Sequence, residues 1–426
     1  MIFLYRVLIN LAIPFGLINL LFRGFKNPQY WVRWRERFGV VPHEVKSVAP
    51  FDYWIHAVSV GEARAAAPLV NKILEQMPDS KILLTTTTPT GSAMVQMLLG
   101  DKVKHCYFPY DLAWAMNRFV AEVSAKFVLI METEIWPNMI NAVKRHGGRL
   151  VYINVRLSER SYKGYARFSS FAQKTLMQVD HFAVQGKMDN KHLELLNVPS
   201  GKITVTGSIK FDVNTQASLH ESAQVLRRQL GGDRLIWIAG STREGEEGRL
   251  ISVYKKLKQQ FPTLLLVLVP RHPERFDLIA RKLQRHSLEH VRRTEGHTEL
   301  SASTDVYLGD TMGELSLMYA CSDIAFVGGS LVPLGGQNIL EPCALGVPVL
   351  FGPHMFNFPD ISRWTIKEGA GKMVKDSQEL TEVLSALLES PSERDKMGSR
   401  GLAFIEAHRG ALSKNYNLIQ KLSMSN

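Results

Sequence analysis

The sequence predicts an α/β protein that contains two doubly wound parallel sheets, one in each half of the chain. The length of 426 residues exceeds one ordinary domain and suits two. In both halves, short apolar runs alternate with helix-like stretches, and a polar stretch interrupts this alternation near the middle. Because alternating strands and helices build right-handed crossover units, each half should form a sheet covered by helices on both faces.

The first half shows this alternation from residue 51 onward. Its buried strands are expected at 51–58, 81–86, 126–131, 149–154 and 179–184. Its helices are expected to include 62–77, 89–99, 113–124 and 136–146. A first doubly wound domain therefore covers residues 38–212.

The second half repeats the pattern after the polar stretch "GSIKFDVNTQASLHESAQ", which predicts a linker over 213–234. Strands are expected at 235–240, 263–270, 305–310, 323–329 and 347–352. A second domain therefore covers 235–426. Ligands of doubly wound sheets bind at the carboxyl ends of the strands, so two such domains in tandem predict a ligand cleft between them.

Composition and charge exclude several classes of protein. With 45% hydrophobic and 21% charged residues, the chain is globular. Its 3 cysteines form no CxxC pair, which argues against a disulfide framework or a cysteine zinc site and suits reduced cytoplasm. The net charge of +11 comes with no nucleic-acid reader motif, so nucleic acid is not an expected partner.

The N-terminus predicts attachment to a membrane through residues 1–37. Residues 2–22 are apolar over about the length needed to span a bilayer, but Arg6, Asn10, Pro14 and Asn19 interrupt them. A spanning helix and a helix lying in the interface both stay open, and a buried core helix is a weaker alternative. Cations follow this segment, which suits anionic lipid and keeps the bulk of the chain on the cytoplasmic face.

A carboxylate stands at the mouth of the first strand, in "HAVSVGEARAAAPLV" (56–70). Glu62 lies in the first turn of the following helix, where the helix dipole alone would favour it. The dipole should also lower the pKa of Glu62 and keep it ionised. An ionised carboxylate at a ligand-binding edge can act as a general base. Both the structural and the catalytic interpretation follow from this placement.

Polar residues at strand ends of the second half suggest a nucleotide site. The stretch "GGSLVPLGGQNILEP" (328–342) has glycines whose backbone amides could approach a phosphate. Glu341 lies three residues beyond Asn338, on the same helical face, where it could accept hydrogen bonds from a ribose. Arg271 and His272 end an apolar strand and suit phosphate contacts, and Ser241, Thr242 and Arg243 are further phosphate candidates.

Five motifs in order, "SVGE", "ETEIWPN", "GSIKFD", "PRHPERF" and "GGQNILEP", resemble the 3-deoxy-D-manno-octulosonic acid (Kdo) transferases of lipopolysaccharide synthesis. The resemblance spans residues from about 50 to 350. It implies a GT-B fold with two Rossmann-like domains. It also implies transfer of Kdo from CMP-Kdo to the lipid A precursor lipid IVA, on the cytoplasmic face of the inner membrane.

The resemblance also implies roles for individual residues. Glu62 matches the family's catalytic base, and Glu132 and Lys210 match positions credited with transition-state stabilisation. The residues matching the family's CMP site are Pro270, Arg271, His272, Met312, Gly313, Glu314, Asn338, Ile339, Leu340 and Glu341.

These observations predict an inverting transferase that needs no metal, since no DxD pair is placed to hold one on the leaving group. Two other functions stay open from the residues themselves. One is a GT-B transferase that uses a UDP-sugar and a lipid-linked acceptor. The other is a membrane-tethered protein that binds a sugar nucleotide without catalysis.

Overall fold

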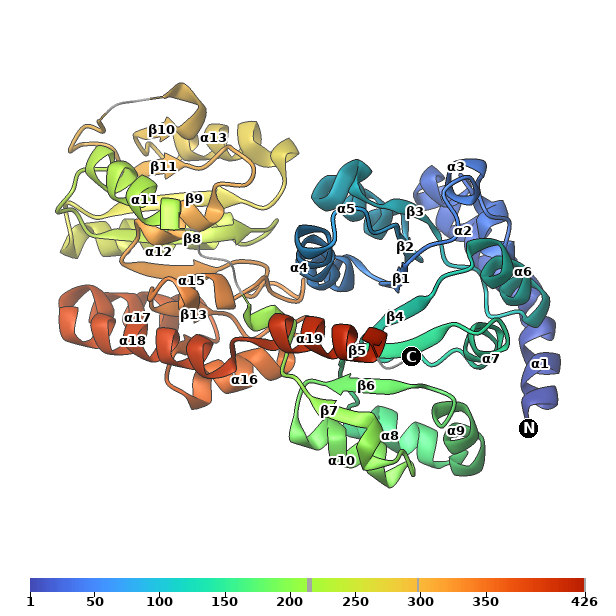
Figure 1. Cartoon of the computed structure of the whole chain (residues 1–426). Helices are drawn as coiled ribbons and strands as arrows, with labels where there is room; N and C mark the ends of the chain where they lie inside the picture. Colours follow the sequence, from blue (N-terminus) through green and yellow to red (C-terminus); the bar gives the residue numbers. More distant parts are fainter. Residues whose placement is uncertain (213–216, 297–298, 425–426) are drawn as a thin grey trace. The chain divides into compact units, whose positions relative to one another are not determined.

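The computed structural model describes residues 1–212, 217–296 and 299–424 (Figure 1). The chain forms two compact units. The first comprises Met1–Asp212 together with Arg409–Asn426, and the second comprises Val213–His408. Each unit is built on one parallel sheet of 7 strands, so the predicted pair of doubly wound sheets is confirmed.

The sheet of the first unit has the strand order β3-β2-β1-β4-β5-β6-β7. Its strands are β1 (Tyr53–His56), β2 (Ile82–Thr86), β3 (Lys104–Tyr107), β4 (Phe127–Met131), β5 (Arg149–Val155), β6 (His181–Val184) and β7 (Ile203–Val205). The five predicted strands are confirmed, and the two that the sequence did not reveal, β3 and β7, are the edge strands.

Helices cover both faces of this sheet, and the strand side chains alternate between the two cores. On β1, Trp54 joins one buried cluster while Tyr53 and Ile55 join another. Val128 and Leu129 on β4 divide in the same way, as the two-residue period of a strand requires. The helices are α3 (His43–Lys46), α4 (Val60–Gln76), α5 (Pro89–Leu99), α6 (Ala113–Val123), α7 (Pro137–Arg145), α8 (Glu159–Ala166), α9 (Ser169–Leu176) and α10 (Lys187–Leu195).

The sheet of the second unit has the order β10-β11-β9-β8-β12-β13-β14. Its strands are β8 (Ile236–Thr242), β9 (Leu265–Pro270), β10 (His290–Arg292), β11 (Val306–Leu308), β12 (Ile324–Val327), β13 (Val349–Phe351) and β14 (Gly371–Met373). Its helices are α11 (Ala217–Gln229), α12 (Glu247–Gln260), α13 (Phe276–Arg285), α14 (Leu315–Ala320), α15 (Leu340–Ala344), α16 (Pro359–Lys367), α17 (Ser377–Glu389) and α18 (Pro391–His408). The missed strands, β10 and β14, are again the two edges.

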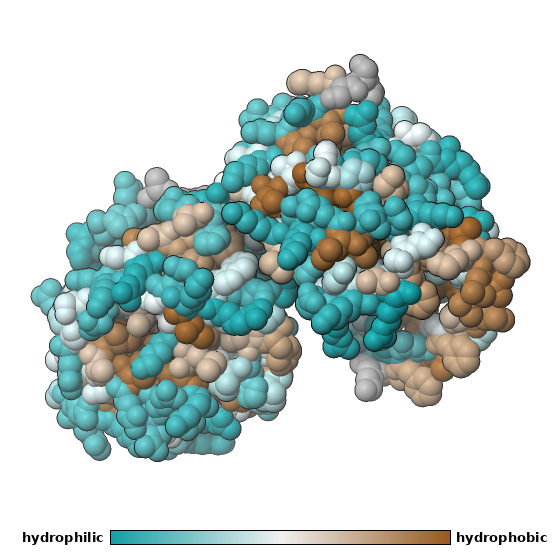
Figure 2. All heavy atoms as spheres, turned by 90° about the horizontal axis from the view of Figure 1, so that it is seen from below, coloured by the Kyte–Doolittle hydropathy of each residue, from teal (hydrophilic) through white to brown (hydrophobic). Residues whose placement is uncertain are grey.

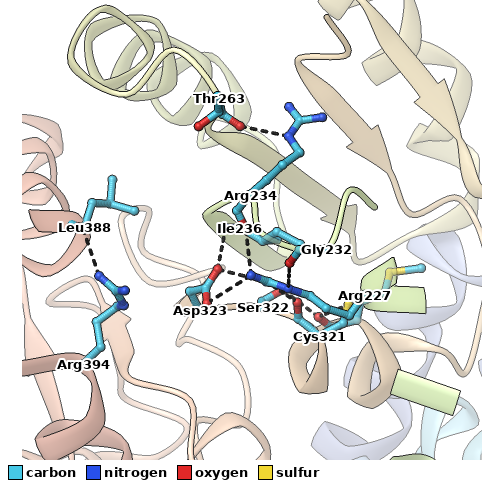
Figure 3. Close-up of polar contacts among 11 residues, drawn as sticks. Arg227, Gly232, Arg234, Ile236, Thr263, Cys321, Ser322, Asp323, Leu388 and Arg394 are labelled. Carbon is cyan, nitrogen blue, oxygen red and sulfur yellow. Dashed lines mark hydrogen bonds and ion pairs between the residues drawn. The ribbon is translucent and has the colours of Figure 1, made fainter. Parts of the chain in front are cut away.

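The predicted linker over 213–234 is wrong for its described part, because residues 217–229 form helix α11 of the second unit. Figure 3 shows what fixes this helix: the guanidinium of Arg227 donates hydrogen bonds to the backbone oxygens of Gly232, Arg234 and Cys321. It also pairs with Asp323 at 2.9 Å, and Asp323 in turn accepts a hydrogen bond from the N–H of Ile236 in β8. Residues 213–216 lie outside the described part of the chain.

The end of the chain also differs from the prediction that the second domain runs to residue 426. Helix α19 (Ala411–Met424) belongs to the first unit, where it packs against α4. Asp212 accepts hydrogen bonds from the N–H groups of Gly410 and Leu412, and Ile419 is buried in the same core as Ile55 of β1. The second unit therefore ends at His408.

The N-terminal apolar segment forms α1 (Ile2–Leu11) and α2 (Ile13–Lys26). In the part of the chain that the structure describes, no one helix has the length and apolarity to cross a bilayer, but these two together, bent by 43°, do by length and composition. Helix α1 buries none of its residues, so it is not a core helix. Figure 2 shows apolar side chains gathered at the right edge of that view, the side on which Figure 1 places α1.

The basic flank after this segment also makes contacts within the first unit. Arg37 is only 4% exposed, lies over the ring of Tyr107 and donates to the backbone oxygen of Thr87. Arg33 pairs with the buried carboxylate of Glu36 at 2.6 Å. These two cations therefore help to hold residues 33–37 against the sheet of the first unit.

Candidate active site

The predicted catalytic carboxylates lie where the winding of the first sheet reverses. Strand β1 pairs with β2 on one side and with β4 on the other. Glu62 follows β1, and Glu132 follows β4 directly. The carboxyl ends of adjacent strands at such a reversal form the ligand-binding edge of a doubly wound sheet. The fold thus brings together two residues that are far apart in the sequence.

The backbone entering α4 holds the carboxylate of Glu62 in one orientation. Ser59 is the N-cap residue, and its hydroxyl oxygen accepts a hydrogen bond from the Glu62 N–H at 3.3 Å. The same hydroxyl donates to Glu62 Oε1 at 3.0 Å, and the Val58 N–H donates to Oε2 at 2.8 Å. This reciprocal cap leaves Glu62 only 8% exposed.

Burial above all, together with the charges of Glu132 and Glu134, raises the pKa of Glu62 to about 7, although the hydrogen bonds from Val58 and Ser59 act to lower it. The prediction that Glu62 has a lowered pKa is therefore wrong. The dipole is outweighed by loss of solvent and by like charges that the sequence alone does not bring together. A carboxylate with this pKa can accept a proton near neutral pH.

Glu132 and Lys210, which the motifs place among the functional residues, form an ion pair. Lys210 Nζ lies 3.1 Å from Glu132 Oε1, and each side chain is about one quarter exposed, at 28% and 27%. Glu132 has a φ of 57°, in the left-handed region that is costly for a non-glycine residue. Its N–H donates to the backbone oxygen of Ile153, which holds this conformation.

Asn154 is a residue of this site that the sequence did not reveal. It is fully buried, with a φ of 58°, where the pairing of β5 with β6 is irregular. Its Oδ1 accepts a hydrogen bond from the Ile209 N–H at 3.1 Å and so fixes the short turn that carries Lys210. The only signal in the sequence is the tolerance of asparagine for positive φ.

The glycine-rich loop of the second unit does not offer its first amides to a phosphate, which corrects the prediction. Glu246 is fully buried, and its carboxylate accepts hydrogen bonds from the N–H groups of Gly329, Ser330 and Leu331 at 2.6–2.9 Å. Gly328 is needed for close approach to the neighbouring strand, since an added Cβ would lie 2.6 Å from the backbone oxygen of Ser241. This part of the loop is thus a structural turn.

Asn338 and Glu341 do lie together, although not on one helix as predicted. Helix α15 begins at Leu340, so Asn338 precedes it, and Asn338 Nδ2 donates to Glu341 Oε1 at 3.1 Å. Both side chains are half-buried, whereas Ile339 and Leu340 are fully buried. The side chains of Ile339 and Leu340 therefore pack in the core of the second unit.

Pro270 is the last residue of β9, where it pairs with Thr242 of β8, and Arg271 and His272 follow it. The Arg271 N–H donates to the backbone oxygen of Thr242 at 3.0 Å. Ser241 has a φ of 54° at an irregularity of the β8–β9 pairing. Burial, followed by the charge of Arg243, lowers the pKa of His272. The structure thus groups these candidates for phosphate contacts at one strand edge.

The third predicted segment, 312–314, contains an exposed Met312, a Gly313 with φ of 87°, and Glu314. Glu314 is held by Arg293, whose Nη2 donates to Oε1 at 2.8 Å, and by the hydroxyl of Thr311. The Arg293 guanidinium lowers the pKa of Glu314. No group of three or more His, Cys, Asp or Glu side chains in the described part of the chain is arranged to hold a metal ion.

Comparison with known proteins shows the family. Residues 32–213 match the family model of 3-deoxy-D-manno-octulosonic-acid transferase (kdotransferase). The chain is 39% identical to the 3-deoxy-D-manno-octulosonic acid transferase of Haemophilus influenzae, over 98% of each chain. It is 36% identical to the enzyme of the same name from Bordetella pertussis, over 90% of each chain.

A solved structure supports the fold. The chain superposes with a TM-score of 0.57 on the UDP-GlcNAc 2-epimerase from Neisseria meningitidis, covering 88% of this chain and 100% of that one. At 16% identity this likeness shows the fold alone, and it agrees with the GT-B class that the motifs imply. Together with the motifs and the near full-length relatives, the two doubly wound units establish that this chain belongs to the Kdo transferase family.

Proposed function

We propose that this Kdo transferase moves Kdo from CMP-Kdo to lipid IVA with inversion at the anomeric carbon, and that Glu62 is the general base. The observation that carries this proposal is the capped, buried carboxylate with a pKa of about 7 at the carboxyl end of β1. General-base catalysis is most efficient when the pKa of the base lies near the working pH.

In the proposed reaction a sugar hydroxyl of the acceptor gives its proton to Glu62 as its oxygen attacks the anomeric carbon of Kdo. The new carbon–oxygen bond forms on the face opposite the departing group. The bond between that carbon and the phosphate oxygen of CMP breaks, and CMP leaves with the bonding electron pair. The balance of the step therefore needs one base and a group that stabilises the negative charge on CMP.

The other matched residues support this step in distinct ways. Lys210 is a cation held by Glu132 at 3.1 Å, on a turn fixed by Asn154, so its position is set before substrate binds. Arg271 suits the phosphate of CMP, and Asn338 with Glu341 suits the hydroxyls of its ribose. Membership of the family favours CMP-Kdo over a UDP-sugar as donor.

The deciding experiment incubates the purified full-length protein with CMP-Kdo and lipid IVA and weighs the lipid product by mass spectrometry. Addition of Kdo with release of CMP is the expected result. A parallel reaction with a UDP-sugar should yield no product, and CMP should inhibit more strongly than UMP. Transfer from the UDP-sugar alone, or no transfer to lipid IVA, would overturn the proposal.

A further inference from the structure

An apolar cavity of about 450 Å³ lies in the first unit beside the N-terminal helix α1. Its volume is in the range of ligand pockets, roughly 300–1,000 Å³. The walls are formed mainly by aromatic and aliphatic groups. Those that matter here are Tyr5, Ile135, Pro137, Gly164, Tyr165 and Phe168. Phe168 is 64% exposed, so apolar surface continues from the cavity to solvent.

One wall of the cavity belongs to the loop after β4 that carries Glu132 and Glu134. Both Ile135 and Pro137 line the cavity; Ile135 comes directly after Glu134 in "ETEIWPN", and Pro137 comes two residues later. Ile135 and Tyr165 both line the cavity and both pack against the same buried core cluster of the first unit. The cavity thus begins one residue beyond Glu134, whose charge helps to raise the pKa of Glu62.

The opposite wall is held in place by polar contacts of α1. The hydroxyl of Tyr5 donates to Asp111 Oδ2 at 2.8 Å, and Arg6 Nε donates to Asn138 Oδ1 at 2.9 Å. Asp111 also accepts hydrogen bonds from the N–H groups of Asn138 and Met139. Tyr5 and Arg6 therefore dock α1 onto the unit, and Tyr5 completes the wall of the pocket.

A basic stripe runs along the helix that lines the cavity. On and just after α8, three cations recur at spacings of three and four: Arg160, Lys163 and Arg167. Each directly precedes a residue that lines the pocket, namely Ser161, Gly164 or Phe168. Lys163 pairs with Glu159 at 3.2 Å. Within the described part of the chain, Arg160 and Arg167 have no carboxylate partner. An apolar pocket bordered by cations is complementary to a phosphorylated, acylated lipid.

We propose that this pocket holds one acyl chain of the acceptor lipid, with an acceptor phosphate against Arg160 and Arg167. The inference rests on the proposed function, because it assigns the occupant to the acceptor. The shared wall favours the acceptor over bulk membrane lipid: a sugar held at Glu62 and Glu134 brings its own acyl chains to Ile135 and Tyr165.

Gly164→Leu tests the pocket by filling it. A Cβ added at Gly164 would meet nothing within 4 Å, so leucine enters the cavity without displacing the helix. Gly201→Leu, in the exposed turn Ser200–Lys202, is the matched control, since a Cβ there also meets nothing within 4 Å. Both variants are compared with the wild type on two acceptors: acylated lipid IVA and the same phosphorylated disaccharide after removal of all acyl chains.

The apparent KM of Gly164→Leu for the acylated acceptor should rise about tenfold, as expected when an acyl chain loses its burial site. Its KM for the deacylated acceptor should stay within about twofold of wild type. Gly201→Leu should match wild type on both. Equilibrium binding of fluorescent lipid IVA, without donor, should weaken by the same factor only in Gly164→Leu.

An unchanged KM, or an equal rise on both acceptors, would overturn the pocket assignment. So would weaker retention of Gly164→Leu on phosphatidylglycerol vesicles with an unchanged KM, because the cavity would then hold bulk membrane lipid. If the wild type transfers Kdo to neither acceptor, the proposed function fails. The lipid-binding comparison then still decides whether the pocket takes an acyl chain.

Discussion

Glu62→Gln should lower turnover while raising stability at alkaline pH. It removes the proposed proton acceptor, and it also removes a carboxylate whose ionised form is less stable in the folded protein than in the unfolded chain. The amide keeps the shape of the side chain but cannot take a proton from the acceptor hydroxyl. Turnover should fall by roughly 100-fold or more, the range for loss of a general base. Affinity for CMP should stay near the wild-type value.

The stability effect follows from the raised pKa. In the folded protein the pKa of Glu62 is raised from 4.5 to about 7. Since the folded state binds this proton more tightly than the unfolded chain, wild-type stability falls as pH rises through this window, and the full loss is present above it. A pKa rise of this size corresponds to about 3 kcal/mol.

Glutamine does not ionise, so it escapes this cost. The amide oxygen can accept a hydrogen bond from Val58 or from Ser59 but not both at separate oxygens, which costs about 1 kcal/mol. Glu62→Gln should therefore be more stable than wild type by about 2 kcal/mol at pH 8. At pH 4 this advantage should disappear.

The assay pairs a pH–rate profile with urea unfolding at both pH values. The wild-type profile should lose activity tenfold per pH unit below a pKa near 7. The residual activity of Glu62→Gln should not show this decrease at low pH. Wild-type turnover in the variant would refute the assignment of the base, and equal stability at pH 8 would refute the reasoning about its burial.

Three further predictions concern the residues around the two candidate sites. Lys210→Met breaks the pair with Glu132 and should lower turnover at least about tenfold with CMP affinity unchanged, while Lys210→Arg should recover part of the loss in the same assay. Asn154→Ala should lower the free energy of unfolding by about 2 kcal/mol and reduce turnover. Alanine is strained at positive φ, and its side chain cannot accept the hydrogen bond that the Ile209 N–H donates to Asn154. Asn154→Gly, which tolerates the backbone conformation, should lose less stability. Glu246→Ala leaves backbone donors of the glycine-rich loop unpaired and should cost about 3 kcal/mol or more in urea unfolding, with loss of CMP binding in calorimetry.

Each of these has a result that would contradict it. Full turnover in Lys210→Met would show that the ion pair is structural. Equal stability of the Asn154→Ala and Asn154→Gly variants would show that the left-handed backbone is not the cause. Normal CMP affinity in a folded Glu246→Ala protein would separate the loop from the nucleotide site.

The central strands and the fold class could be predicted because burial on both faces leaves a continuous apolar run in the sequence. Strands such as β1 and β9 carry that signal. The strands that the prediction missed are the sheet edges, and they are short and contain polar residues such as Lys104, His290 and Lys372. An edge strand is defined by its neighbour more than by its own composition.

By itself, the sequence determined the order of strands and helices, the motifs of the family and the placement of Glu62 at a strand end, since these depend on neighbours in the chain. Only the tertiary structure decided the pKa of Glu62, which depends first on burial and then on the charges of Glu132 and Glu134. It also decided that Glu246 occupies the amides of the glycine-rich loop, and that the last helix packs on the first unit. These outcomes arise from contacts between distant segments, where loss of solvent and charge proximity outweigh any local preference.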